Sequence, residues 1–86
     1  MIRKVVRVKW VDSCSSYSNW VLTDEIEADV KPIYIITFGI VLQECDEFVT
    51  IAQNYGMEPE QCCNLMTIPR GCITKYEVIE EIEISE

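Results

Sequence analysis

Apolar and polar positions alternate along much of the chain, and the longest apolar stretch lies at its centre. Two apolar runs, residues 33–42 and 48–52, are separated by a polar string at 43–47. Both runs are rich in β-branched and aromatic residues, a pattern that predicts a β-hairpin. Gly39 lies inside the first run and predicts a bulge or a sharp bend there. We expect the other segments to pack around this hairpin.

The two ends of the chain show the same alternation. In residues 2–11, four of the five even positions are apolar and three of the odd ones are basic, namely Arg3, Arg7 and Lys9. From residue 72 onward the even positions are mostly apolar, and the odd ones carry Lys75, Glu77, Glu81 and Glu83. Each segment predicts a half-buried strand. If they pair antiparallel, Arg3, Arg7 and Lys9 face those glutamates and help to fix the register.

Turn-forming residues separate these segments. Residues 12–32 predict a long first loop, in which Thr23 as an N-cap predicts one or two helical turns within 23–30. Residues 53–63 predict a second loop, 64–68 a short strand, and Pro69 to Gly71 a break before the last strand.

The pattern as a whole predicts an all-β fold, a small five-stranded SH3-like or Sm-like barrel in one domain, residues 1–86. An open antiparallel sheet with one helix (α+β) is the alternative. The alternating tail at 82–84 offers an edge to which a neighbouring subunit can add a strand.

Composition narrows the functional classes. The 86 residues are 49% hydrophobic and carry a net charge of −8. Because phosphate binding needs many Lys and Arg side chains, this charge argues against broad contact with nucleic acid. The sequence has neither an apolar run of about 18 residues nor the pattern of a secretion signal. We therefore expect a cytoplasmic protein with no membrane contact.

Candidate chemistry is sparse. The chain has no histidine, so its serines lack the usual catalytic partner, and the acidic group within 24–29 lacks the spacing of a Ca²⁺ loop. We expect no enzymatic activity, no cofactor and no metal site. The five cysteines are an odd number and form no Cys-x-x-Cys pair, which favours reduced thiols. The adjacent Cys62 and Cys63 leave open a redox or soft-metal pair.

The binding residues expected from the sequence lie in the first loop and the Pro-Arg-Gly turn. Trp20 and Tyr17 can stack on a base or a ring, and Asp12, Ser13 and Asn19 can provide hydrogen bonds. Arg70 is the best single candidate for an anionic ligand. The alternatives are that Trp20 anchors the loop to the barrel and that Arg70 forms an ordinary surface ion pair.

Three motifs resemble small uncharacterised β-rich proteins encoded by tailed phages and prophages. The first is the sequence at 8–13 followed by Trp20, and the others are residues 39–52 and 67–73. The resemblance spans about residues 5 to 79, excludes the acidic tail, and implies a phage-encoded accessory protein without catalytic residues.

Two functional hypotheses follow. In the first, the protein is a non-enzymatic accessory module that binds itself as a homo-oligomer, or binds a host protein. In the second, the oligomer acts in the host cytosol as an anti-defence sponge that sequesters a small (cyclic) nucleotide immune signal. The charge of −8 counts against the second hypothesis, because an anionic ligand needs a locally basic pocket.

Overall fold

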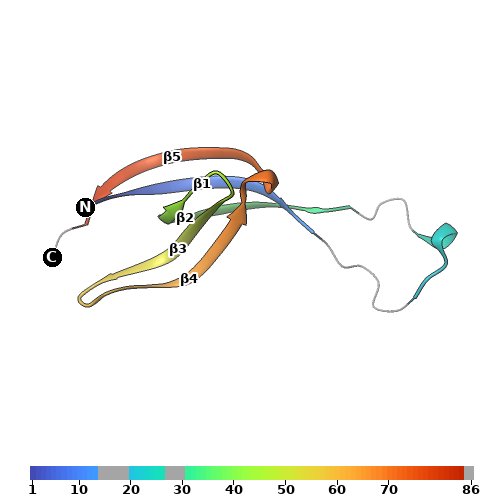
Figure 1. Ribbon diagram of the computed structural model, residues 1–86, viewed down its shortest axis with the longest axis horizontal. Coiled ribbons are helices and arrows are strands. Elements are labelled where there is room, and N and C mark those ends of the chain that lie inside the picture. Colours follow the sequence, from blue (N-terminus) through green and yellow to red (C-terminus); the bar gives the residue numbers. More distant parts are fainter. Residues whose placement is uncertain (14–19, 27–30, 85–86) are drawn as a thin grey trace.

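The computed structural model describes residues 1–13, 20–26 and 31–84, and the strands among them form one antiparallel five-stranded sheet (Figure 1). The strand order across the sheet is β4-β3-β2-β1-β5. The all-β class and the five strands are thus confirmed. The strands and the two 3-10 turns are β1 (Ile2–Asp12), η1 (Thr23–Glu25), β2 (Ile33–Glu44), β3 (Phe48–Met57), β4 (Glu60–Pro69), η2 (Arg70–Cys72) and β5 (Ile73–Glu83).

The sheet is open in the described part of the chain, since β4 and β5 form its two edges. The predicted helical turns reduce to η1, a single 3-10 turn. Leu22 precedes η1 in extended conformation without a side-chain capping bond, so the prediction of Thr23 as N-cap is wrong. Residues 27–30 of the predicted turns lie outside the described residues.

The predicted second loop at 53–63 is also wrong. β3 continues to Met57, β4 begins at Glu60, and the ladder between them pairs Asn54 with Cys63 and Gly56 with Gln61. Asn and Gly favour turns locally, but interstrand hydrogen bonds override a propensity of this size. The result is a long β3–β4 hairpin that extends away from the rest of the sheet (Figure 1).

The core lies on one face of the sheet, where β1 contributes its even positions. Val6 and Val8 are fully buried and Trp10 nearly so, as the alternation predicts. The indole nitrogen of Trp10 donates a 3.0 Å hydrogen bond to the buried Thr37 hydroxyl, so neither polar group is left unsatisfied. The remaining buried members come from β2, β3 and β4: Val41, Val49, Ile51 and Ile68. Burying each Val or Ile side chain contributes roughly 1.5–3 kcal/mol.

The first and last strands pair antiparallel, which confirms that the two ends of the chain lie side by side. The amino group of Met1 lies 3.0 Å from the Glu83 carboxylate, and the Ile84 amide donates to the Met1 carbonyl. Arg7 faces Glu77 and forms an ion pair with it, as expected.

The other two predicted charge pairs are absent. Arg3 faces Ile82 and donates a 2.8 Å hydrogen bond to the Leu42 carbonyl, whereas Lys9 faces Lys75. The register that places Arg7 opposite Glu77 also places Lys9 opposite Lys75, whereas Arg3 lies beyond a register shift between Val5 and Val6. A second shift lies between Lys9 and Trp10. Each shift leaves one extra β5 residue unpaired and changes which side chain lies opposite.

Gly39 lies where β2 changes partners. β2 pairs with β1 as far as Ile40, and it pairs with β3 from Ile40 onward. A Cβ atom at Gly39 would lie 2.1 Å from the Ile51 Cγ2 atom and 2.8 Å from the Ala52 carbonyl oxygen. The glycine thus permits a close approach of β3, while the irregularity in β2 itself lies between Val41 and Gln43.

Gly39→Ala should destabilise the protein, because the added methyl group meets a backbone carbonyl that cannot move alone. We expect a loss of roughly 1–3 kcal/mol in the free energy of unfolding, measured by urea denaturation. Gly71→Ala is the matched control, since nothing lies within 4 Å of its added Cβ. Equal stability of the two variants would contradict the close approach.

Candidate functional site

The first-loop residues predicted to bind a ligand are only partly brought together. Asp12 is the last residue of β1, and its carboxylate accepts a 2.8 Å hydrogen bond from the Ser13 amide. Trp20 is fully exposed, so it does not anchor the loop to the sheet. Its segment, residues 20–26, projects beyond the end of the β1–β2 ribbon (Figure 1). Tyr17 and Asn19 lie outside the described residues.

Arg70 is bound within the chain. Its Nε donates a 2.9 Å hydrogen bond to the Cys45 carbonyl, and one guanidinium nitrogen lies 3.6 Å from a Glu44 carboxylate oxygen. Its backbone amide donates to the Glu47 carbonyl at 2.9 Å. These contacts fix η2 to the β2–β3 turn. The geometry is that of the ion-pair alternative, and it does not place Arg70 beside Trp20.

Arg70 belongs to a charged cluster centred on Glu44. The Lys4 ammonium lies 2.7 Å from the Glu44 Oε2 atom, and the Tyr76 hydroxyl donates to the same oxygen at 3.2 Å. Lys4 and Arg70 also lie over the Tyr76 ring, 5.6 and 5.4 Å from its centroid. Four segments meet here: β1, the end of β2, η2 and β5.

The electrostatics of this cluster follow from its contacts. The hydrogen bond from Lys4 lowers the pKa of Glu44, against the opposing effect of burial. The same bond raises the pKa of Lys4, and burial raises the pKa of Tyr76. Both charged partners are thus held in their ionised forms near neutral pH. The cluster is suited to holding four segments together at one end of the core.

Sequence reasoning missed this cluster. Its members lie far apart in the chain, and Glu44 is one of several acids in a polar turn. The sequence feature that could have indicated this cluster is Lys4, the one charged residue among the apolar even positions of the first strand. A charge on a core-facing position predicts a partner at the margin of the core.

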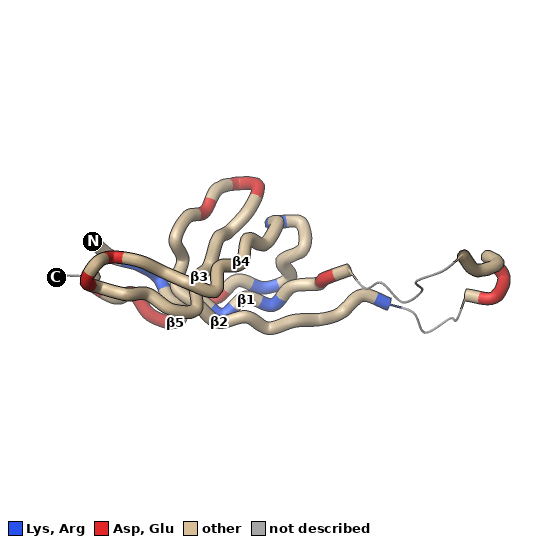
Figure 2. Tube along the Cα trace, turned by 90° about the horizontal axis from the view of Figure 1, so that it is seen from below, with Lys and Arg blue, Asp and Glu red and all other residues tan. Residues whose placement is uncertain are grey.

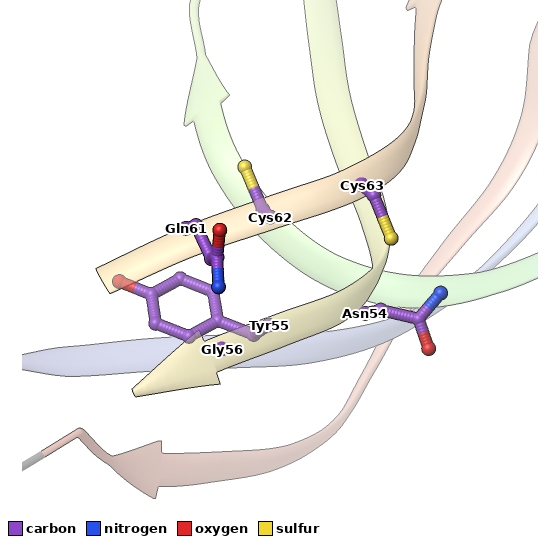
Figure 3. A pocket seen from close by; sticks show the side chains of 6 residues that line it. All are labelled: Asn54, Tyr55, Gly56, Gln61, Cys62 and Cys63. Carbon is purple, nitrogen blue, oxygen red and sulfur yellow. The ribbon is translucent and has the colours of Figure 1, made fainter. Parts of the chain in front are cut away.

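A shallow hollow of about 460 Å³ lies on the β3–β4 hairpin (Figure 3). It is lined by Asn54, Tyr55 and Gly56 from β3 and by Gln61, Cys62 and Cys63 from β4. The Cys62 and Cys63 thiols project to opposite sides of β4 (Figure 3), as neighbouring residues in a strand do. They therefore do not converge on one ion as a soft-metal pair would.

The thiols of Cys45, Cys62, Cys63 and Cys72 are free. Across residues 1–13, 20–26 and 31–84 there is no group of three or more potential metal ligands. No helix in the same ranges is long and apolar enough to cross a membrane.

The two edge strands expose apolar side chains to an unusual extent. Of the ten residues of β4, only Ile68 is buried. Leu65 and Met66 are 56% and 39% exposed, and on β5 Val78 and Ile79 are 48% and 52% exposed. A free sheet edge can pair with an added strand.

Comparison with protein-family models, with curated proteins and with solved structures gave no match. The resemblance to phage proteins and the nucleotide-binding hypothesis therefore stay predictions.

The charged cluster makes stability depend on pH. The pKa of Glu44 is below its ordinary value of 4.5, so its ionised form stabilises the fold above that pH, and this contribution is lost as the pH falls through the lowered pKa. Glu44→Gln should cost about 1 kcal/mol at pH 7 and remove this part of the acid-induced loss. Chemical denaturation of both proteins between pH 7 and the acid range measures the difference.

Glu60→Gln, which removes an exposed carboxylate in the β3–β4 hairpin, is the control for the change in net charge. If Glu44→Gln and Glu60→Gln shift the stability curve equally, the cluster contributes nothing specific.

Proposed function

We propose that this protein is a non-enzymatic binding module that works as a homo-oligomer, with β4 of one copy paired to β5 of the next. The observation that carries the proposal is β4 itself, an edge strand with apolar residues exposed on both faces. The resemblance to phage proteins adds the expectation of an accessory role.

β4 has the sequence of an inner strand but the position of an edge. Leu65 pairs with Ala52 on one face of the sheet, and Met66 pairs with Ile51 on the core face. Strands that are apolar on both faces are typical of sheets covered on both sides. The outer backbone groups of β4 face no other strand in the described part of the chain, so they can pair with an added one.

Charge favours β5 as the partner of β4. Residues 61–69 of β4 carry no charged side chain, whereas β5 carries Glu77, Glu80, Glu81 and Glu83. Pairing two β5 strands would bring these glutamates together, and like charges across a ladder are destabilising. Pairing β4 with β5 avoids this repulsion and covers the exposed apolar residues of both edges.

The geometry of such pairing is head to tail. Each copy offers β4 at one edge of the sheet and β5 at the other, so every added copy presents the same free edge again. Contacts of this kind close into rings when the rotation between copies permits. In an SH3-like or Sm-like barrel these two edge strands approach each other, and here we propose that the approach is made between chains.

Leu65→Asp and Ile79→Asp should each abolish pairing between edges and lower the mass of the assembly, to a single chain or to a dimer held by another surface, because each places a carboxylate on an edge that must be covered. Size-exclusion chromatography with light scattering, and native mass spectrometry, measure the mass. Gln53→Asp adds the same charge to an exposed position of the inner strand β3 and should leave the mass unchanged. A wild-type protein that is monomeric at every concentration tested would refute the proposal.

A further inference from the structure

A second exposed surface lies on the face of the sheet opposite the core. On β2, Tyr34, Ile36 and Phe38 are 74%, 57% and 54% exposed. They alternate with Ile35, which packs on the core, and with the buried Thr37. Strand geometry therefore places the three exposed side chains on the outer face.

Cations lie beside this apolar column. The register of β1 places Lys9 opposite Ile36 and Arg7 opposite Phe38. Lys9 also faces Lys75 across the β1–β5 ladder, and in the described ranges it forms no ion pair. We call Tyr34, Ile36, Phe38, Arg7 and Lys9 the apolar-basic face. Arg7 is already paired with Glu77, so the positive charge that this face offers to a partner comes mainly from Lys9; the cations lie along β1 in Figure 2.

The complementary features occur in residues 20–26, which we call the tip. Trp20, Leu22 and Ile26 are 103%, 65% and 50% exposed. Between them lie the carboxylates of Asp24 and Glu25, and the sequence from 20 to 30 contains four acidic residues and no Lys or Arg. The backbone is extended at Leu22 and Ile26, on both sides of η1. The tip is thus a short acidic segment with three apolar side chains in water.

We propose that the tip of one copy docks on the apolar-basic face of a second copy, and that the second copy docks its own tip in return. The apolar side chains of the tip would cover Ile36 and Phe38, and its carboxylates would lie near Lys9. In its own chain the tip lies beyond the end of the β1–β2 ribbon (Figures 1 and 2). A two-fold arrangement satisfies both copies at once, because both surfaces belong to every chain.

This contact is independent of the pairing between β4 and β5. It uses the outer face and the ribbon end, whereas the edge contact uses the outermost strands. The two proposals can therefore be tested separately. Leu65→Asp, which should abolish edge pairing, provides the background in which the tip contact is measured.

Charge reversal tests the contact without threatening the fold. Lys9→Glu replaces a Lys–Lys pair by a Glu–Lys pair across the ladder, so the sheet should not be weakened. Asp24→Lys with Glu25→Lys changes two exposed residues of the tip. Each variant, in the Leu65→Asp background, should raise the dissociation constant of the dimer about tenfold. Sedimentation velocity over a dilution series measures it.

Mixing the two charge-reversed chains tests directly whether the tip of one copy contacts the face of the other. In the mixed pair, the reversed tip meets the reversed face and the native tip meets the native face, so a heterodimer should form with about the affinity of the parent protein. Trp20 emission should move to shorter wavelength as the dimer forms, while the buried Trp10 contributes a constant signal.

Three results would overturn the tip contact. One is a Leu65→Asp protein that is monomeric throughout, with Trp20 emission independent of concentration. Another is a mixture of the charge-reversed chains that fails to associate. The third is a shift in Trp20 emission that both reversals abolish but that does not depend on concentration, since this would place the tip on its own chain. If instead Leu65→Asp leaves the assembly intact and the reversals dissociate it, edge pairing fails and the tip contact stands.

Discussion

The antiparallel pairing of β1 with β5 is the constraint on which the rest of this structure depends. It joins the two ends of the chain, so that a sheet of five strands has its first strand inside and its last strand at an edge. It also brings Tyr76 to Lys4 and hence to the cluster around Glu44. Without this ladder, β5 would be a free strand, and the charged cluster would lose the side chain over which its two cations lie.

The same arrangement explains why so much apolar surface remains exposed. The buried apolar cluster is small, and its members come from β1, β2, β3 and β4. A chain of 86 residues buries only about 60–65% of the surface that its unfolded form exposes. Here the apolar surface that stays unburied is concentrated on the sheet edges and on the outer face of β2, where the residues are large and apolar. Surfaces of this kind are stable in water when another chain covers them.

The alternation of apolar and polar residues was enough to predict the strands that have one buried and one exposed face. The first and last strands and the central hairpin were found because Val6, Val8 and Trp10 repeat with period two, and because the apolar runs on both sides of the polar turn are clear. The β3–β4 hairpin was missed because Asn54 and Gly56 read as turn residues, whereas the interstrand ladder holds them extended.

The register of the last strand could not be predicted either, because a break in the alternation does not by itself show how a bulge shifts the ladder. The Glu44 cluster depends on that register and on the β2–β3 turn reaching η2, and both are long-range properties of the fold. For the same reason the predicted ligand site did not anticipate that Arg70 is held by the Cys45 carbonyl.

Charge placement gives this small sheet a directional pattern. Cations lie along β1, which is paired on both sides, and carboxylates gather on the outer strand β5 and at the tip (Figure 2). In the proposed contacts, an acidic edge would repel its own copy but not the uncharged stretch of β4, and the acidic tip would be attracted to the cations of β1. This placement of the charges would therefore disfavour contact between like surfaces and permit contact between unlike ones. In the proposed assembly of identical chains, that asymmetry would give the contacts a defined geometry, since apolar surface alone does not distinguish one orientation from another.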